Sequence, residues 1–414
     1  MSQSGGQPRL SVLRALWDQR NYRLLWIGQT LSIMGDSMIW VAAALYITTT
    51  TGSTRDVGIV LAAGSAALVI FLLFGGVWAD RRPRQRIMIG SDLIRATVQT
   101  LLAALIFTGE PPLWLFACLV AVFGAASAFF QPAYTGLVPQ TVPEEMIQVA
   151  QGVAHTSHYV AAFIGPGIAT LLALHAGFGW VYAIDAATFV VSALLLVWIV
   201  PRPRATVDDA PAQSMRHELV AGFREVSSRA WVWVTLLVAL VAVMAALGPF
   251  QALGATVARD THNEISIFGW FQVASGIGAI LGAASAVRWR PRFPMRTATA
   301  WILAWPASIA VYALGAPTWV TLGAGVVSGF GSSIFLVQWE TALAQRIPPG
   351  SLSRVSSYDW MVSLALLPVG YLGAGFLAEH FDAASVLLSG ATLGVVAVAA
   401  GLLSHELRNL RRID

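Results

Sequence analysis

The feature that most constrains this chain is a succession of apolar stretches, each about as long as a bilayer is thick. Apolar residues make up 57% of the 414 residues and charged residues only 11%, whereas a soluble domain carries about 25% charged residues. Such a chain lacks the polar side chains that cover a water-facing surface. A helix of roughly 20 apolar residues crosses a bilayer, so the sequence predicts an all-α membrane protein.

Apolar runs between Pro, Gly and Arg breaks predict twelve transmembrane helices. They cover residues 24–48, 57–79, 87–108, 112–137, 149–173, 178–200, 231–257, 266–287, 297–315, 318–343, 355–378 and 384–404. The turns at 109–111 and 316–317 are short, so the spans on either side of each turn are nearly continuous. An even number of spans places both termini on the same side of the membrane.

The arginine distribution predicts the orientation. All 25 basic residues are Arg, and 22 of them fall in the termini and in the loops on the same side. The opposite loops carry only Arg55 and Arg259, and Arg95 lies inside the third span. Cytoplasmic loops are enriched in basic residues, so we expect both termini in the cytoplasm and the protein in a bacterial inner membrane. The long apolar stretch after the first arginines predicts a retained helix rather than a cleaved signal peptide.

The chain contains an internal repeat. The segment LVPQTVPEEMIQVAQ at 137–151 aligns with LAQRIPPGSLSRVSS at 343–357 at a shift of 206 residues, about half the chain. The repeat predicts an N-terminal six-helix half at 1–200 and a C-terminal six-helix half at 231–414. Between them, residues 201–230 are predicted to form a cytoplasmic linker with a short amphipathic helix. Six spans per half give the halves the same orientation, which makes them parallel repeats.

A glycine, an aspartate and two arginines mark the loop between spans two and three. Gly76, Asp80, Arg81 and Arg84 resemble the G-x-x-x-D-R-x-x-R signature of the major facilitator superfamily, although Gln85 departs from its last position. The resemblance implies the twelve-helix major facilitator fold. It also implies that these residues form an inner-gate latch that stabilises the outward-facing state. The alternative is an ordinary basic cytoplasmic loop.

Two residues in the third span extend this hypothesis. Asp92 and Arg95 are three residues apart, so they share a helix face and are expected to pair. We assign them to support of the latch or to a structural role.

Further stretches resemble one branch of the superfamily. Residues 21–36, 91–96 and 180–189 are similar to those of drug and siderophore exporters related to the enterobactin exporter. Gly165 and Pro166 lie in a partial match to the family's antiporter signature, in which Ala161 and Ala169 replace expected glycines. Proline in a helix removes a backbone donor and kinks the helix. We therefore interpret Gly165-Pro166 either as an exchange-promoting kink or as a packing kink.

Ionisable residues inside the bilayer are costly and often functional. Asp36 lies near the middle of the first span with apolar residues on both sides. It is the leading candidate for proton coupling or for binding a cationic substrate, and the alternative is a structural hydrogen bond. Asp185 in the sixth span is interpreted as structural. The weaker candidates for coupling or substrate contact are Glu340, Asp359, Gln131 and Gln338.

The sequence excludes several other functions. It contains no G-x-x-x-x-G-K-[ST] loop for ATP and no Ser/His/Asp set, and its one cysteine is Cys118. His155 and His158 lack Cys, Asp or Glu at metal-binding spacing. We therefore expect no enzymatic activity, no cofactor, no metal and no nucleic-acid partner.

The leading functional hypothesis is a monomeric secondary active transporter. It would work in the lipid bilayer as an antiporter that admits protons while a lipophilic, drug-like or siderophore-like molecule leaves, which would confer multidrug resistance. The alternatives are a proton-coupled importer of a small nutrient, and a non-transporting receptor or lipid-translocating protein.

Overall fold

A computed structural model of the chain describes residues 9–202, 223–289, 291–348, 355, 358–359 and 365–412. Their regular elements are all helical, and ten stretches are long and apolar enough to cross a membrane. The all-α prediction is therefore confirmed. The predicted linker helix lies largely outside the described residues, of which 223–227 are helical.

The two remaining predicted spans are not single long helices in the described residues. The span predicted at 297–315 is divided into α12 (Pro294–Ile302) and α13 (Ala304–Ala313). Pro306 explains the break, because its ring clashes with the carbonyl four residues earlier, at Ile302. The span predicted at 355–378 is described from residue 365 onward, where α16 covers Leu367–Leu377.

Contacts divide the structure into two compact units. Unit 1 comprises residues 1–39 and 67–208, and unit 2 comprises residues 40–66 and 209–414. The helices of the N-terminal half are α1 (Arg9–Asp18), α2 (Arg20–Thr50), α3 (Thr54–Arg81), α4 (Arg84–Thr108), α5 (Leu113–Leu137), α6 (Ile147–His175) and α7 (Phe178–Val197). The short helices η1 (Val138–Gln140) and η2 (Glu144–Met146) connect α5 to α6.

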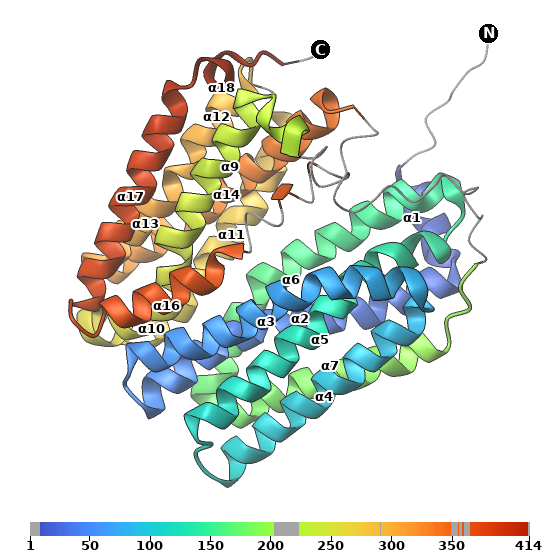
Figure 1. Ribbon diagram of the computed structural model, residues 1–414, viewed down its shortest axis with the longest axis horizontal. Helices are drawn as coiled ribbons and strands as arrows, with labels where there is room; N and C mark the ends of the chain where they lie inside the picture. Colours follow the sequence, from blue (N-terminus) through green and yellow to red (C-terminus); the bar gives the residue numbers. More distant parts are fainter. Residues whose placement is uncertain are drawn as a thin grey trace. The chain divides into compact units, whose positions relative to one another are not determined.

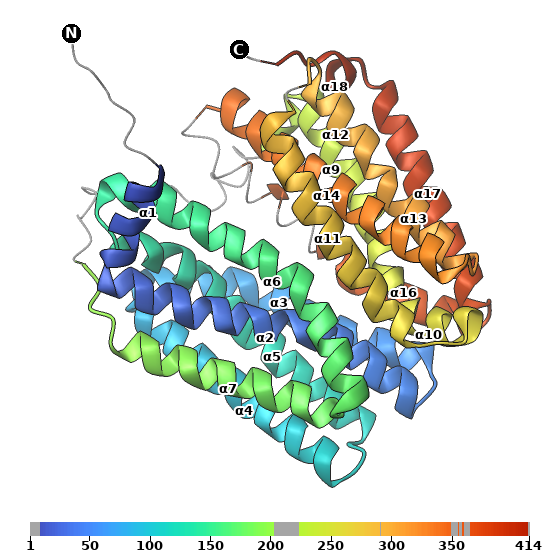
Figure 2. The same ribbon diagram turned by 180° about the vertical axis from the view of Figure 1, so that it is seen from behind.

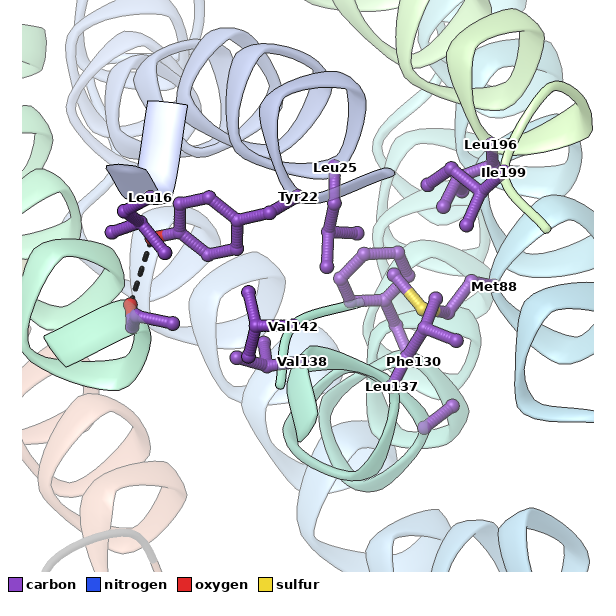
Figure 3. Packing of buried hydrophobic residues seen from close by; sticks show 12 residues of the cluster. Leu16, Tyr22, Leu25, Met88, Phe130, Leu137, Val138, Val142, Leu196 and Ile199 are labelled. Carbon is purple, nitrogen blue, oxygen red and sulfur yellow. Dashed lines mark hydrogen bonds between the residues drawn. The ribbon is translucent and has the colours of Figure 1, made fainter. Parts of the chain in front are cut away.

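In unit 1, α4 packs along both α5 and α7 (Figure 1). Unit 1 contains an apolar cluster that includes Leu16, Tyr22, Met88 and Phe130 (Figure 3). The Tyr22 hydroxyl donates to the Ala150 carbonyl at 2.8 Å, so the polar tip of this buried ring is satisfied. The cluster ties α1 and α2 to α4, α5 and α6, and it positions Phe130 for the site described below.

Unit 2 contains the remaining helices, and the last turns of α2 and the first turns of α3 join it. They are α9 (Ala230–Ala242), η3 (Val243–Leu247), α10 (Gly248–His262), α11 (Ser266–Arg288), α12, α13, α14 (Thr318–Arg346), α16, α17 (Ala383–Leu403) and α18 (His405–Asn409). The short stretch η3 is a π-helical turn, and Pro249 follows it. Proline cannot donate to the carbonyl four residues back, which favours a wider turn there.

The start of α3 is held against α16. A Cβ at Gly58 would lie 2.6 Å from the Tyr371 carbonyl oxygen, so the two helices meet where α3 has no side chain. Arg55 pairs with Glu379 at 3.5 Å and lies 4.8 Å from the centre of the Phe376 ring. Residues 40–66 therefore belong to unit 2 by packing, although they precede residue 200, the predicted end of the N-terminal half.

The most extensive helix contact among the described residues of unit 2 joins α11 and α14, which lie side by side in Figure 2. Gly278 and Gly282 of α11 lie against the backbone of α14, and Gly325 and Gly329 of α14 lie against α11. Both pairs have the small-xxx-small spacing that lets membrane helices approach closely. The crossing is therefore reciprocal, with each helix inserting its backbone where the other lacks side chains.

Candidate functional site

A single buried guanidinium, that of Arg95 on α4, organises a cluster of charged side chains inside unit 1. Arg95 donates to a carboxylate oxygen of Asp92 at 2.5 Å and to one of Asp36 on α2 at 3.2 Å. The side chains of Arg95 and Asp92 are 2% and 0% exposed, whereas that of Asp36 is 29% exposed. Asp36 is therefore the open member of the ion cluster.

The Arg95 guanidinium lies between two aromatic rings. Its central carbon is 4.2 Å from the ring centres of both Phe130 on α5 and Phe189 on α7. Each ring face attracts the cation and also excludes water from it. Arg95 is thus held in place by Asp92 of its own helix and by one carboxylate and two rings from three neighbouring helices.

The second oxygen of Asp92 is also occupied. The Ser192 hydroxyl of α7 donates to it at 2.7 Å, and the Gln29 side-chain amide of α2 donates to the same hydroxyl at 2.9 Å. This chain of hydrogen bonds connects α2, α7 and α4. Both oxygens of Asp92 thus accept hydrogen bonds, and this arrangement positions Arg95.

Asp185 on α7 is a fourth charged residue in this region, and its side chain is fully buried. Gln99 donates to one oxygen at 2.6 Å and Thr188 contacts the other at 3.4 Å. A Cβ at Gly35 would fall within 2.1 Å of that second oxygen, so Asp185 lies directly against the backbone of α2 beside Asp36. The sequence-based interpretation of Asp185 as structural stays a prediction, and sequence reasoning did not include its proximity to Asp36. The available signal in the sequence was a carboxyl group among uncharged residues of a membrane span, because such residues often have a function.

The cluster contains more carboxyl groups than cations. Among the described residues, Arg95 pairs with Asp36 and Asp92, and Asp185 has hydrogen bonds but no ion pair. The buried Gln99 Oε1 has no hydrogen-bond donor. A buried uncompensated carboxylate is costly, and neutralisation by a proton removes that cost. The arrangement can therefore bind and release protons.

Gly165 brings α6 against α2 one residue beyond Asp36. A Cβ at Gly165 would lie 1.8 Å from the Ser37 hydroxyl oxygen, and this hydroxyl donates to the Ala161 carbonyl at 2.8 Å. The adjacent Pro166 lies inside α6 and offers no backbone donor. The Gly165-Pro166 pair thus stands at a helix crossing next to the charge cluster.

Replacement of Gly165 by alanine is expected to lower transport and to reduce stability by about 1–3 kcal/mol, because the added methyl group has no space beside Ser37. The matched control is Gly152→Ala on the same helix, where a Cβ meets nothing within 4 Å. Transport and thermal unfolding of the two variants measure the difference. Equal behaviour of both variants would show that the close approach at Gly165 is not required.

The predicted latch residues are placed only in part. Arg84 donates to the Gly136 carbonyl at 2.5 Å, close to the carboxyl end of α5, where a cation is favourable. Gly76, Asp80 and Arg81 lie in the last turns of α3, and the side chains of Asp80 and Arg81 are outside the described structure. Asp92 and Arg95 form the expected pair, but this pair lies in the cluster with Asp36.

The weaker candidates do not join this cluster. Gln131 is exposed on α5. In unit 2, Gln338 is buried with its amide 3.5 Å from the Trp289 carbonyl, and Glu340 is exposed. The Trp339 indole N–H donates to Asp359 at 3.0 Å. Among the described residues, no group of three or more His, Cys, Asp or Glu side chains could hold a metal ion.

A sequence profile described as Major Facilitator Superfamily matches residues 25–358, most of the chain. The chain belongs to the major facilitator superfamily. It is therefore a multi-pass membrane transporter and not an enzyme, and the twelve-helix fold predicted from the sequence is confirmed.

Relatives and solved structures agree with this assignment. This transporter is 25% identical over 404 residues to macrolide efflux protein A of Streptococcus pyogenes, covering 95% of this chain and 98% of the relative. It is 25% identical over 407 residues to the enterobactin exporter of Salmonella typhimurium, covering 94% of each. The structure of a nucleoside transporter superposes with a TM-score of 0.76 at 14% identity, over 92% of this chain and 98% of the other. That identity shows the fold alone.

Proposed function

We propose that this transporter exports a lipophilic small molecule across a bacterial inner membrane in exchange for protons. Two relatives that align over nearly their full length are named for efflux, one of macrolides and one of enterobactin. Both names refer to molecules rather than to inorganic ions. The site that supports proton coupling is the charge cluster of unit 1.

The observation that carries the proposal is the partial exposure of Asp36 beside the buried pair of Asp92 and Arg95. Asp92 has a donor on each oxygen and is fully buried, so it stays paired with Arg95. Asp36 shares the same guanidinium at a longer distance and is 29% exposed. Of the two carboxylates bound to Arg95, Asp36 is the one that a proton or a cationic substrate can reach.

Proton binding to Asp36 would act on the contact between α2 and α4. The neutral carboxyl no longer attracts the Arg95 guanidinium as an anion does, and Arg95 keeps Asp92 as its partner. Release of the proton restores the ion pair. Loss or gain of this ion pair would shift the position of α2, which also crosses α6 at Gly165. In this way the protonation state of Asp36 would influence alternating access.

The test is transport into inverted membrane vesicles from cells that express the transporter. A radiolabelled macrolide and radiolabelled enterobactin are the probes. An imposed pH gradient with the vesicle lumen acidic should drive accumulation of a probe inside the vesicles. Collapse of the gradient should abolish this accumulation. The Asp36→Asn variant should fall to the level of vesicles without the transporter. The control is Asp18→Asn, which removes an exposed aspartate on α1 and should transport normally.

Two results would contradict this proposal. Accumulation that ignores the pH gradient would remove proton coupling. Gradient-driven accumulation that survives in Asp36→Asn would remove Asp36 as the coupling residue. The next candidate would then be Asp185 of α7, which lies against α2 beside Asp36.

A further inference from the structure

A groove on the surface of unit 1 is separate from the charge cluster. It has a volume of about 410 Å³, within the range of about 300–1,000 Å³ typical of small-molecule sites. The end of α3, the first half of α4 and the middle of α5 form its walls. Its apolar lining includes Trp78, Ile87, Ile94 and Phe129, and its basic lining consists of Arg82 and Arg86.

The groove has a polar end and an apolar end. Arg82 follows α3 and Arg86 lies in the first turn of α4, whereas Ile94 lies eight residues further along α4. At 1.5 Å per residue, the groove extends about 12 Å from the guanidinium end to Ile94. A ligand that fills it must therefore carry an anionic group at one end and an apolar chain at the other.

The groove is open at the surface of unit 1, between helices that are long and apolar enough to span a bilayer. Trp78 and Ile94 are 58% and 48% exposed, although both belong to helices that are long and apolar enough to span a bilayer. Trp78 packs edge-on against Phe129 with ring centres 5.7 Å apart, which makes one apolar wall. Exposed apolar side chains of this kind on a membrane-spanning helix are suited to contact with acyl chains.

The polar end of the groove is formed by two arginines. Arg82 and Arg86 are exposed, and neither forms an ion pair with another described residue. Arg82 and Arg86 flank the short turn between α3 and α4, and the ends of membrane-spanning helices lie at the membrane–water boundary, where the phosphate groups of lipids are. Arginine binds phosphate through two parallel hydrogen bonds.

One residue in the groove wall leaves space for the chain. Gly90 lines the groove one turn beyond Arg86, and a Cβ there would meet no atom within 4 Å. This glycine is therefore not required for contact between helices of the described structure. A larger side chain at this position would fill the groove without disturbing the packing of α4.

We propose that this groove is a binding site for one anionic phospholipid, with its phosphate on Arg82 and Arg86 and an acyl chain along Trp78, Gly90 and Ile94. Charge complementarity favours this occupant, because lipids of the surrounding membrane present an anionic group and an apolar chain in this order. The site is independent of the transported molecule and of Asp36. Its occupant bridges α3, α4 and α5.

The experiment is native mass spectrometry of the detergent-purified chain with added phosphatidylglycerol or phosphatidylcholine of identical acyl chains. We expect preferential retention of phosphatidylglycerol. Retention should fall about tenfold in Arg82→Gln/Arg86→Gln, which corresponds to loss of about 1.4 kcal/mol of binding. It should also fall in Gly90→Leu, in which the charges are unchanged and the chain is blocked.

Matched controls separate this site from general surface charge and from glycine replacement. Arg14→Gln/Arg20→Gln removes two exposed arginines from α1 and α2, and Gly152→Leu fills open space on α6. Both controls should retain the lipid as the unchanged protein does. Equal loss in a control variant, or equal retention of the two lipids by the unchanged protein, would overturn the proposal. So would displacement by inorganic phosphate together with normal lipid retention in Gly90→Leu, because that result indicates a site for free phosphate.

Discussion

Replacement of Arg95 by glutamine is expected to lower the free energy of unfolding by about 3–5 kcal/mol and to abolish transport. Removal of one partner from a buried ion pair leaves an uncompensated charge, and here Asp92 is fully buried. The variant also loses the cation held between Phe130 and Phe189. Thermal unfolding of the detergent-purified protein measures the loss of stability.

Two further variants show whether charge causes this effect. The Arg95→Gln/Asp92→Asn variant removes the stranded anion as well and should recover much of the stability, but not transport. The comparison variant is Arg229→Gln, because Arg229 forms an ion pair with Glu225 and both side chains are only half-buried. Its free energy of unfolding should fall by about 1 kcal/mol or less. Equal losses of stability in Arg95→Gln and Arg229→Gln would show that Asp92 does not depend on Arg95 for compensation of its charge.

Replacement of Gly329 by leucine is expected to separate α11 from α14 and to cost about 3 kcal/mol, the upper part of the range for overpacking. A Cβ at Gly329 would lie 1.7 Å from the Ser275 carbonyl oxygen, and backbone cannot rotate away as a side chain can. The reciprocal contacts of Gly278 and Gly282 would be lost with it. Thermal unfolding and the yield of folded protein after membrane extraction measure the effect.

Gly323→Leu is the matched control for this variant. It makes the same change on the same helix, but a Cβ at Gly323 meets no atom within 4 Å. The control should be as stable as the unchanged protein. Similar losses in both variants would show that leucine at any glycine of α14 is harmful, and that the close crossing is not the cause.

Much of the fold could be predicted from the sequence because the bilayer imposes local rules. A span must be about 20 apolar residues long, and ten of the twelve predicted spans are continuous helical stretches. The break between α12 and α13 at Leu303 was not predicted. Its cause, Pro306, is visible in the sequence, but proline within a membrane helix bends it in some contexts and ends it in others.

The site could be predicted only where its contacts are local. Asp92 and Arg95 are three residues apart on one helix, so their pairing follows from helix geometry. The partnership of Arg95 with Asp36 joins residues 59 positions apart, and that of Gln99 with Asp185 joins residues 86 positions apart. Sequence spacing contains no information on these contacts, which depend on how α2, α4 and α7 pack.

The sequence by itself determined that the chain crosses the membrane many times, in two similar halves, with an aspartate in its first span. These properties follow from residue type and from short-range periodicity. The tertiary structure alone decided that Arg95 serves both Asp36 and Asp92, that Asp185 lies against α2, and which glycines are contact points. Gly323 and Gly329 are identical residues on one helix, and only the position of the neighbouring backbone distinguishes them.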